Sequence, residues 1–271
     1  MSSDPSTTPT FVRARPTDIA PTPESRWLLF NDAGVLMRGT ELPSTVDIAG
    51  VTPEAPLYLG SADDIAYFAD NLASDIRIPG GLSVCSLRSL SGNTGDLTWS
   101  IAGYASQMLY WRKTGKYCPV CATATEGRVQ DWGRVCPNCG HIGYPRVSPA
   151  VLILIHDDNR ILLASKPGWD RFSILAGFVD SAETLEECVR RETMEEVRLT
   201  VSDIEYAGSQ SWPFPHQLMI GFNCRYAAGD ITVDEDELDR AGWFTPDNLP
   251  PLPPAISLSR RMIDAWLDGQ R

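Results

Sequence analysis

Residues 177–199 read GFVDSAETLEECVRRETMEEVRL, and the spacing of their acidic side chains indicates both the fold and the chemistry. On a helix with about 100° per residue, one sector of about 120° holds apolar and acidic positions together. These positions are Leu185, Cys188, Val189, Glu192, Glu195 and Glu196. Side chains three and four apart on a helix lie at roughly 5 to 6 Å, so Glu192 is expected close to both other acids. Their mutual repulsion needs a counter-charge, and a divalent cation is the natural one.

A solvated acidic helix face is the alternative interpretation, because runs of charge usually face water. We accept it for Glu186 and Glu187. It fits the other three acids poorly, because they share the sector of the apolar side chains.

The composition is that of a globular chain. It has 271 residues, 43% of them hydrophobic, and a formal net charge of −12. This length suits about two domains. The longest clean apolar run, residues 150–155, is far shorter than the ~20 residues of a membrane span, so none is expected. The first 25 residues lack the hydrophobic core of a secretory signal, so we expect a flexible segment and a cytoplasmic chain.

Four of the seven cysteines form two Cys-x-x-Cys pairs separated by fourteen residues: Cys118, Cys121, Cys136 and Cys139. This spacing predicts a closed, structural Zn²⁺ site with no ligand position left for catalysis. Ribbons of this kind often touch nucleic acid, but the charges between the pairs are mixed and the chain is acidic, so we favour a scaffold. The remaining cysteines are expected to be buried thiols.

The order of turn residues and apolar runs predicts four segments: a flexible segment (1–25), a small α+β domain (26–112), a zinc ribbon (113–144) and an α/β domain (145–271). In the α+β domain we expect strands at 27–32, 34–39 and 56–61, helices at 65–72 and 101–110, and a loop at 91–95. In the α/β domain we expect strands at 150–155, 161–165, 205–208 and 218–226, and helices after Ser181 and from Leu258.

The acidic segment resembles the Nudix hydrolase box: Gly177, Glu183, then Arg191-Glu192-x-x-Glu195-Glu196. Thr193 and Arg198 stand where the family has an aliphatic residue and a glycine. The resemblance implies a Nudix α/β/α sandwich that hydrolyses a nucleoside diphosphate linked to another group. It implies Mg²⁺ or Mn²⁺ on Glu192, Glu195 and Glu196, which suits hard cations, and pairing of Arg191 with Glu183.

A second segment, SQSWPFPHQLM at residues 209–219, resembles the signature of the NADH pyrophosphatase subfamily. Ser211 and Gln217 depart from that signature. Prolines and aromatic rings suit a wall against a nucleotide, although a turn packed against the core is the plainer alternative. The candidate substrate-binding residues here are Gln210, Ser211, Trp212, Pro213, Phe214, Pro215, His216 and Gln217.

The resemblance implies further site residues. Asp131, Tyr144, Phe178 and Ser259 look like nucleotide contacts, with Tyr144 and Phe178 stacking on the adenine. The carbonyl oxygen of Ala176 and the carboxylate of Glu237 look like further ligands of the catalytic metal. The subfamily completes its site across a homodimer, so we expect a homodimer.

These features predict hydrolysis of NADH or NAD⁺ to nicotinamide mononucleotide (NMN) and AMP, with Glu195 as metal ligand or general base. Removal of the NAD cap from RNA is an alternative with the same chemistry, and Arg112, Lys113 and Lys116 could guide the RNA. A regulator that binds NAD(H) or nucleic acid without catalysis is a third reading. The four retained acids argue against it.

Overall fold

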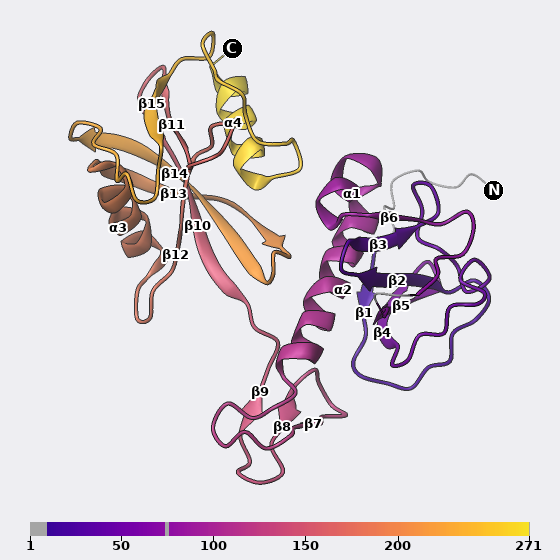
Figure 1. Ribbon diagram of the computed structural model, residues 1–271. Coiled ribbons are helices and arrows are strands. Elements are labelled where there is room, and N and C mark those ends of the chain that lie inside the picture. The colour runs from indigo at the N-terminus through magenta and orange to yellow at the C-terminus, as the bar shows by residue number, and fades with distance from the viewer. Residues whose placement is uncertain (1–9, 74–75, 271) are drawn as a thin grey trace, which may run out of the picture. The chain divides into compact units, whose positions relative to one another are not determined.

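The computed structural model describes residues 10–73 and 76–270. The chain forms two compact units, Met1–Arg146 and Val147–Arg271 (Figure 1). Among the described residues, no helix has the length and apolar character that crossing a membrane requires.

A six-stranded sheet is the centre of the first unit, with strand order β1-β4-β5-β2-β3-β6. Its strands are β1 (Val12–Arg13), β2 (Arg26–Asn31), β3 (Gly34–Met37), β4 (Leu57–Ala62), β5 (Ile65–Asn71) and β6 (Ser83–Cys85). Buried Trp27, Leu29, Leu36 and Phe68 form the core beside it. Two helices follow, α1 (Leu87–Asn93) and α2 (Asp96–Thr114).

The helix predicted at 65–72 is wrong: these residues form β5. Asp63 and Asp64 both have positive φ, 47° and 62°, which is the geometry of a two-residue hairpin turn. β5 pairs with β4 on one side and β2 on the other, so its interior position explains its apolar character. A short apolar run does not distinguish a buried strand from a helix.

Two other local predictions differ from the structure. The loop predicted at 91–95 begins only after α1, which Ser86 caps by accepting a hydrogen bond from the Ser89 amide. Within the segment predicted to be flexible, Val12–Arg13 pairs with β4, and residues 1–9 lie outside the described part of the chain.

The zinc ribbon contains three short strands, β7 (Glu126–Gly127), β8 (Arg134–Val135) and β9 (Ile142–Gly143). α2 leads directly into it. The indole nitrogen of Trp111, near the end of α2, donates to the carbonyl oxygen of Trp132 at 2.8 Å. The ribbon is therefore held against the end of that helix.

The second unit is a three-layer α/β/α sandwich, which confirms the predicted fold class. Its strands are β10 (Ser148–His156), β11 (Ile161–Ser165), β12 (Leu175–Phe178), β13 (Thr200–Trp212), β14 (Gln217–Ala228) and β15 (Arg240–Phe244). Their order is β13-β14-β10-β11-β15, with β12 on β10. Helices α3 (Leu185–Val197) and α4 (Leu258–Gly269) cover opposite faces (Figure 1).

Strand β10 shows why two layers form on the sheet. Successive side chains of a strand point to opposite faces. Val151 and Ile153 belong to the core under α3, whereas Leu152 and Leu154 belong to the core under α4. A strand buried on both faces reads as a continuous apolar run, which is the pattern of residues 150–155.

Candidate active site

Helix α3 begins with a complete capping box. The Thr184 hydroxyl accepts from the Glu187 amide, and the Glu187 carboxylate accepts from the Thr184 amide. Negative charge in a first turn also suits the helix dipole. Glu186 and Glu187 are both exposed, as expected for acids on a solvated helix face.

Three carboxylates meet at the other end of α3. Ligand oxygens of Glu192, Glu196 and Glu237 lie within 4.8 Å of one another. Glu192 is 7% exposed and Glu196 is 1% exposed, whereas Glu237 is exposed in the loop before β15. Glu237 was predicted from the family resemblance and not from spacing, because thirty-nine residues separate it from the end of α3.

Glu196 is buried, and the Lys166 ammonium lies 4.0 Å from its carboxylate. Neither carboxylate oxygen has a hydrogen-bond partner among the described residues. Burial raises the pKa of Glu196 to about 8, against the lowering effect of the Lys166 ammonium, and Glu192 and Glu237 raise it further. Burial likewise raises the pKa of Glu192. Orphaned buried oxygens close to two further carboxylates fit an oxygen-liganded divalent cation.

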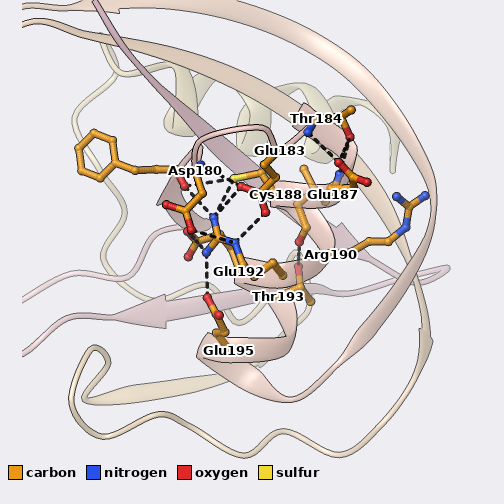
Figure 2. A network of polar contacts seen from close by, with 12 residues as sticks. Asp180, Glu183, Thr184, Glu187, Cys188, Arg190, Glu192, Thr193 and Glu195 are labelled. Atoms are coloured by element: carbon orange, nitrogen blue, oxygen red, sulfur yellow. Dashed lines mark hydrogen bonds and ion pairs between the residues drawn. The ribbon is translucent and has the colours of Figure 1, made fainter.

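Arg191 binds the acids that surround it, and Figure 2 shows three of these acids, Glu183, Glu192 and Glu195, within one network of polar contacts. Its guanidinium donates twice to Glu183, at 2.7 and 2.9 Å, so the expected pair is present. It also donates to Glu192, Glu195 and the Phe178 carbonyl oxygen, each at 2.8 Å. Hydrogen bonds from Arg191 lower the pKa of Glu183 to about 2. The box loop and the helix are thus joined through one side chain.

Glu195 lies outside the three-carboxylate cluster. Its carboxylate accepts from Arg191, and its side chain is 55% exposed. This position is accessible to a water molecule. The choice between metal ligand and general base stays a prediction.

Gly177 lets the sheet approach the acids. It pairs with Val151 in the register of β12 and β10. A Cβ atom at this position would overlap the carboxyl group of Glu192. Glycine is used where backbone must approach another group closely, so this glycine makes room for a predicted metal ligand.

The two departures from the Nudix box have local explanations. The Thr193 hydroxyl, fully buried, donates to the Val189 carbonyl oxygen at 2.7 Å, so its polarity is satisfied inside the helix. Arg198 ends α3 in the left-handed region, with φ 60° and ψ 26°. The family's glycine would adopt this conformation without strain.

One pocket of the second unit, the Glu196 pocket, collects several predicted residues from separate elements. Its lining includes Ala176, Glu196, Gln210, Trp212 and Ser259. Sequence reasoning missed two other residues that line it, Lys166 and Trp169. They lie in a loop without a recognisable motif, and only the Pro-Gly between them signals a turn.

The 209–217 segment covers the end of β13, the hairpin turn and the first residue of β14. Gln210 bridges to the start of α4: its amide donates to the Ile256 carbonyl oxygen at 2.9 Å and accepts from the Leu258 amide at 2.7 Å. Trp212 and Phe214 pack edge to face, with centroids 5.2 Å apart. Ser211, Pro213, Phe214, Pro215, His216 and Gln217 are not in the lining of the Glu196 pocket.

The predicted nucleotide contacts occur in both units. In the first, Arg128 pairs with Asp131 at 3.3 Å and donates to the Tyr144 hydroxyl at 3.0 Å. Tyr144 is 53% exposed. In the second, Phe178 is 52% exposed. Their role in nucleotide binding stays a prediction.

The four ribbon cysteines come together as predicted. Sulfur-to-sulfur distances are 3.6 Å for Cys118 to Cys139, 3.5 Å for Cys121 to Cys136 and 3.6 Å for Cys121 to Cys139. A tetrahedral zinc with ligands at about 2.3 Å requires edges of about 3.8 Å. The cluster therefore fits a structural Zn²⁺ ion.

The predicted basic patch is weaker than its sequence suggests. Arg112 donates to Asp70 at 2.5 Å and to the Ala55 carbonyl oxygen. Lys113 and Lys116 are exposed, but they share a cavity with the acids Asp32, Glu54 and Asp70.

Comparison with known families gives three matches along the chain. Residues 24–111 match the NADH pyrophosphatase-like rudimentary NUDIX domain, residues 113–144 match the NADH pyrophosphatase zinc ribbon domain, and residues 146–267 match the NUDIX domain.

Curated relatives cover most of the chain. It is 38% identical over 250 residues to the NAD-capped RNA hydrolase NudC of Chromobacterium violaceum, covering 92% of this chain and 94% of the relative. It is 40% identical over 243 residues to the protein of the same name from Deinococcus radiodurans, covering 88% and 83%.

Among solved structures, a Nudix hydrolase from Nitrosomonas europaea matches with a TM-score of 0.50 and 22% identity, over 57% of this chain and 92% of that chain. This likeness supports the fold. Together with the family matches and the curated relatives, it shows that the chain belongs to the Nudix hydrolase family, in the group with an NADH pyrophosphatase-type zinc ribbon.

Proposed function

We propose that the chain hydrolyses the pyrophosphate bond of NADH or NAD⁺, releasing AMP and NMN(H). The observation that carries the proposal is the Glu192, Glu196 and Glu237 cluster, because Glu196 also lines the pocket that contains Gln210 and Trp212. The relatives named NAD-capped RNA hydrolases support the substrate class.

The side chains of the site have different proposed roles in this reaction. Mg²⁺ or Mn²⁺ on the carboxylates would neutralise diphosphate charge and lower the pKa of the attacking water. Arg191 holds Glu192 and the box loop in place. Water adds to one phosphorus, the bridging P–O bond breaks, and one proton is released. The exposed Glu195 is a candidate to accept it, or to act as a further metal ligand.

Removal of the NAD cap from RNA is the second candidate, favoured by the activity for which the relatives are named. It breaks the same bond in a longer molecule. Because Arg112 is engaged with Asp70, we expect recognition through the NAD group rather than through the RNA chain. Added salt should then lower the rate of capped-RNA cleavage little more than it lowers the rate of NADH cleavage.

The proposed domain bounds are 26–112, 113–144 and 145–271, and the matched ranges support them. We also propose a homodimer and a cytoplasmic location, and the homodimer rests on the resemblance to the NADH pyrophosphatase subfamily. The presence of all four acids argues against a regulator without catalysis.

The test is to incubate the purified chain with Mg²⁺ or Mn²⁺ and each of NADH, NAD⁺, ADP-ribose and NAD-capped RNA, and to identify products by mass. AMP and NMN(H) from the dinucleotides are expected. If no AMP forms from any substrate, a binding protein becomes the better interpretation. Light scattering on the same sample measures the oligomeric state.

A further inference from the structure

The four-residue segment Lys-Pro-Gly-Trp, residues 166–169, forms a rigid turn at the Glu196 pocket. The Trp169 amide donates to the Lys166 carbonyl oxygen at 3.0 Å, and the glycine has φ 77°. Proline second and glycine third are the residues that a type II turn requires. Because the turn type restricts the backbone, the two end residues are held at the pocket.

Contacts on both sides anchor this turn. Ala164 and Ser173 exchange two backbone hydrogen bonds of 2.8 Å, which close the loop at its base. The Ser165 carbonyl oxygen accepts from the Asp239 amide at 2.8 Å. Elements held in this way position a ligand-binding group more precisely than a free loop does.

Lys166 is the only lysine in residues 147–271. Its ammonium nitrogen lies 4.0 Å from a carboxylate oxygen of Glu196, which is too long for a hydrogen bond. Its side chain is 41% exposed and lines the pocket. Once Glu196 binds a cation, the phosphate of a bound nucleotide becomes the natural partner of this ammonium.

Trp169 supplies a flat apolar surface at the same pocket. Trp169 is 39% exposed, although tryptophan residues are highly buried on average. The Arg171 guanidinium lies over its ring, 4.5 Å from the centroid. An indole that lines a pocket and is left partly exposed suits stacking on a heteroaromatic ring.

We propose that Lys166 and Trp169 bind the NMN half of the substrate, Lys166 at its phosphate and Trp169 at the nicotinamide ring. This rests on the proposed function, which puts the diphosphate at the carboxylates. Phe178, the proposed adenine contact, is absent from the residues that line the Glu196 pocket, two positions beyond Ala176 on β12. The other base is therefore the one that enters the pocket.

The first experiment uses NMN as the probe with Mg²⁺ present, because the Lys166 ammonium is free for a phosphate only when a cation occupies Glu196, and NMN has no pyrophosphate bond to cleave. Calorimetry compares the wild type with Lys166→Met, Lys166→Arg, Trp169→Ala and Trp169→Phe. We expect Trp169→Ala to weaken NMN binding about 10-fold, as loss of a stacking partner does. Lys166→Met should weaken it to a similar extent, whereas Lys166→Arg and Trp169→Phe should retain most of the affinity. Lys113→Met removes the same charge in the other unit and serves as the control.

A second experiment uses the scarcity of lysine. The chain has three lysines, so acetylation of Lys113, Lys116 and Lys166 can be followed by peptide mass analysis on the folded wild type. NMN should slow acetylation of Lys166 and leave the other two unchanged. This measurement needs no variant to fold and no turnover.

The outcomes separate the two proposals. If the wild type cleaves NADH while Lys166→Met and Trp169→Ala bind NMN like the wild type, the turn has no role and the proposed function stands. Equal acetylation of Lys166 with and without NMN would also overturn the inference. If AMP instead of NMN protects Lys166, the assignment of the nicotinamide half is wrong.

Discussion

Gly177 on β12 lies so close to Glu192 on α3 that a methyl group there would overlap the glutamate carboxyl group. The first residue of the Nudix box and its first paired acid are thus in direct contact, although fourteen positions separate them. The spacing of the box therefore has a steric meaning besides its meaning for metal binding.

Gly177→Ala should weaken metal binding more than it lowers stability. The overlapping atoms belong to the end of a flexible side chain, so Glu192 can move away, but it then leaves the cluster with Glu196 and Glu237. We expect Mn²⁺ affinity, measured by calorimetry, to fall about 10-fold, a loss typical of displaced ligands or their supports. Gly242→Ala is the control, because its Cβ would make only ordinary contact, 3.6 Å from Phe244. Equal Mn²⁺ affinity in all three proteins would contradict the steric argument.

Glu196→Gln should abolish metal-dependent hydrolysis while the fold persists, because it removes a buried negative ligand. A fully active variant would show that the acid is not needed. The exposed Glu186 on the same helix provides the control as Glu186→Gln, which should remain active.

The same variant should alter how the stability of the metal-free protein depends on pH. Burial raises the pKa of Glu196 from 4.5 to about 8, so the folded state binds this proton more tightly than the unfolded state does. The stability that this group contributes is fully present below about pH 4.5 and is lost as pH rises towards 8. Denaturation in urea should show wild-type stability declining across this window more steeply than that of Glu196→Gln. Parallel pH profiles would show that Glu196 does not titrate there.

Cys136→Ser should remove the bound zinc. Cys136 is 1% exposed, and its sulfur lies 3.5 Å from that of Cys121 inside the four-cysteine cluster, so a hydroxyl cannot replace the thiolate ligand. Elemental analysis should find about one zinc per chain in the wild type and little in the variant, as a Cys₄ site predicts. Protease cleavage should increase within residues 113–144. Cys85→Ser lies outside the cluster and should keep its zinc.

The fold of the second unit was predictable because its elements have strong and different periodicities. Residues 150–155 form an uninterrupted apolar run, and α3 carries an apolar stripe with an N-terminal cap. In the first unit the apolar runs are short, and one of them, β5, was taken for a helix. No acidic helix marks residues 24–111, so their likeness to a Nudix domain is not visible from residue patterns.

The site was predictable where chemistry requires a particular residue, as at the carboxylates and the cysteines. Lys166 and Trp169 were missed because their loop becomes part of the pocket only when the Ala164–Ser173 bridge closes its base and distant elements such as α3 and β13 pack beside it. Arg128, which joins Asp131 to Tyr144, was missed for the same reason. Such partners depend on tertiary structure, which local patterns do not encode.

Arg198→Gly should stabilise the chain. Arg198 ends α3 with φ 60°, a conformation that costs a residue with a Cβ atom roughly 1 kcal/mol, whereas glycine adopts it freely. The greater entropy of glycine in the unfolded chain offsets part of this gain, so we expect a net increase of about 0.5 kcal/mol. Arg198→Ala separates the two effects, because it removes the side chain but keeps the strained backbone. Urea denaturation should place the glycine variant above both other proteins, with hydrolysis unchanged because Arg198 is outside the carboxylate cluster. A glycine variant no more stable than the alanine variant would show that the left-handed turn costs nothing here.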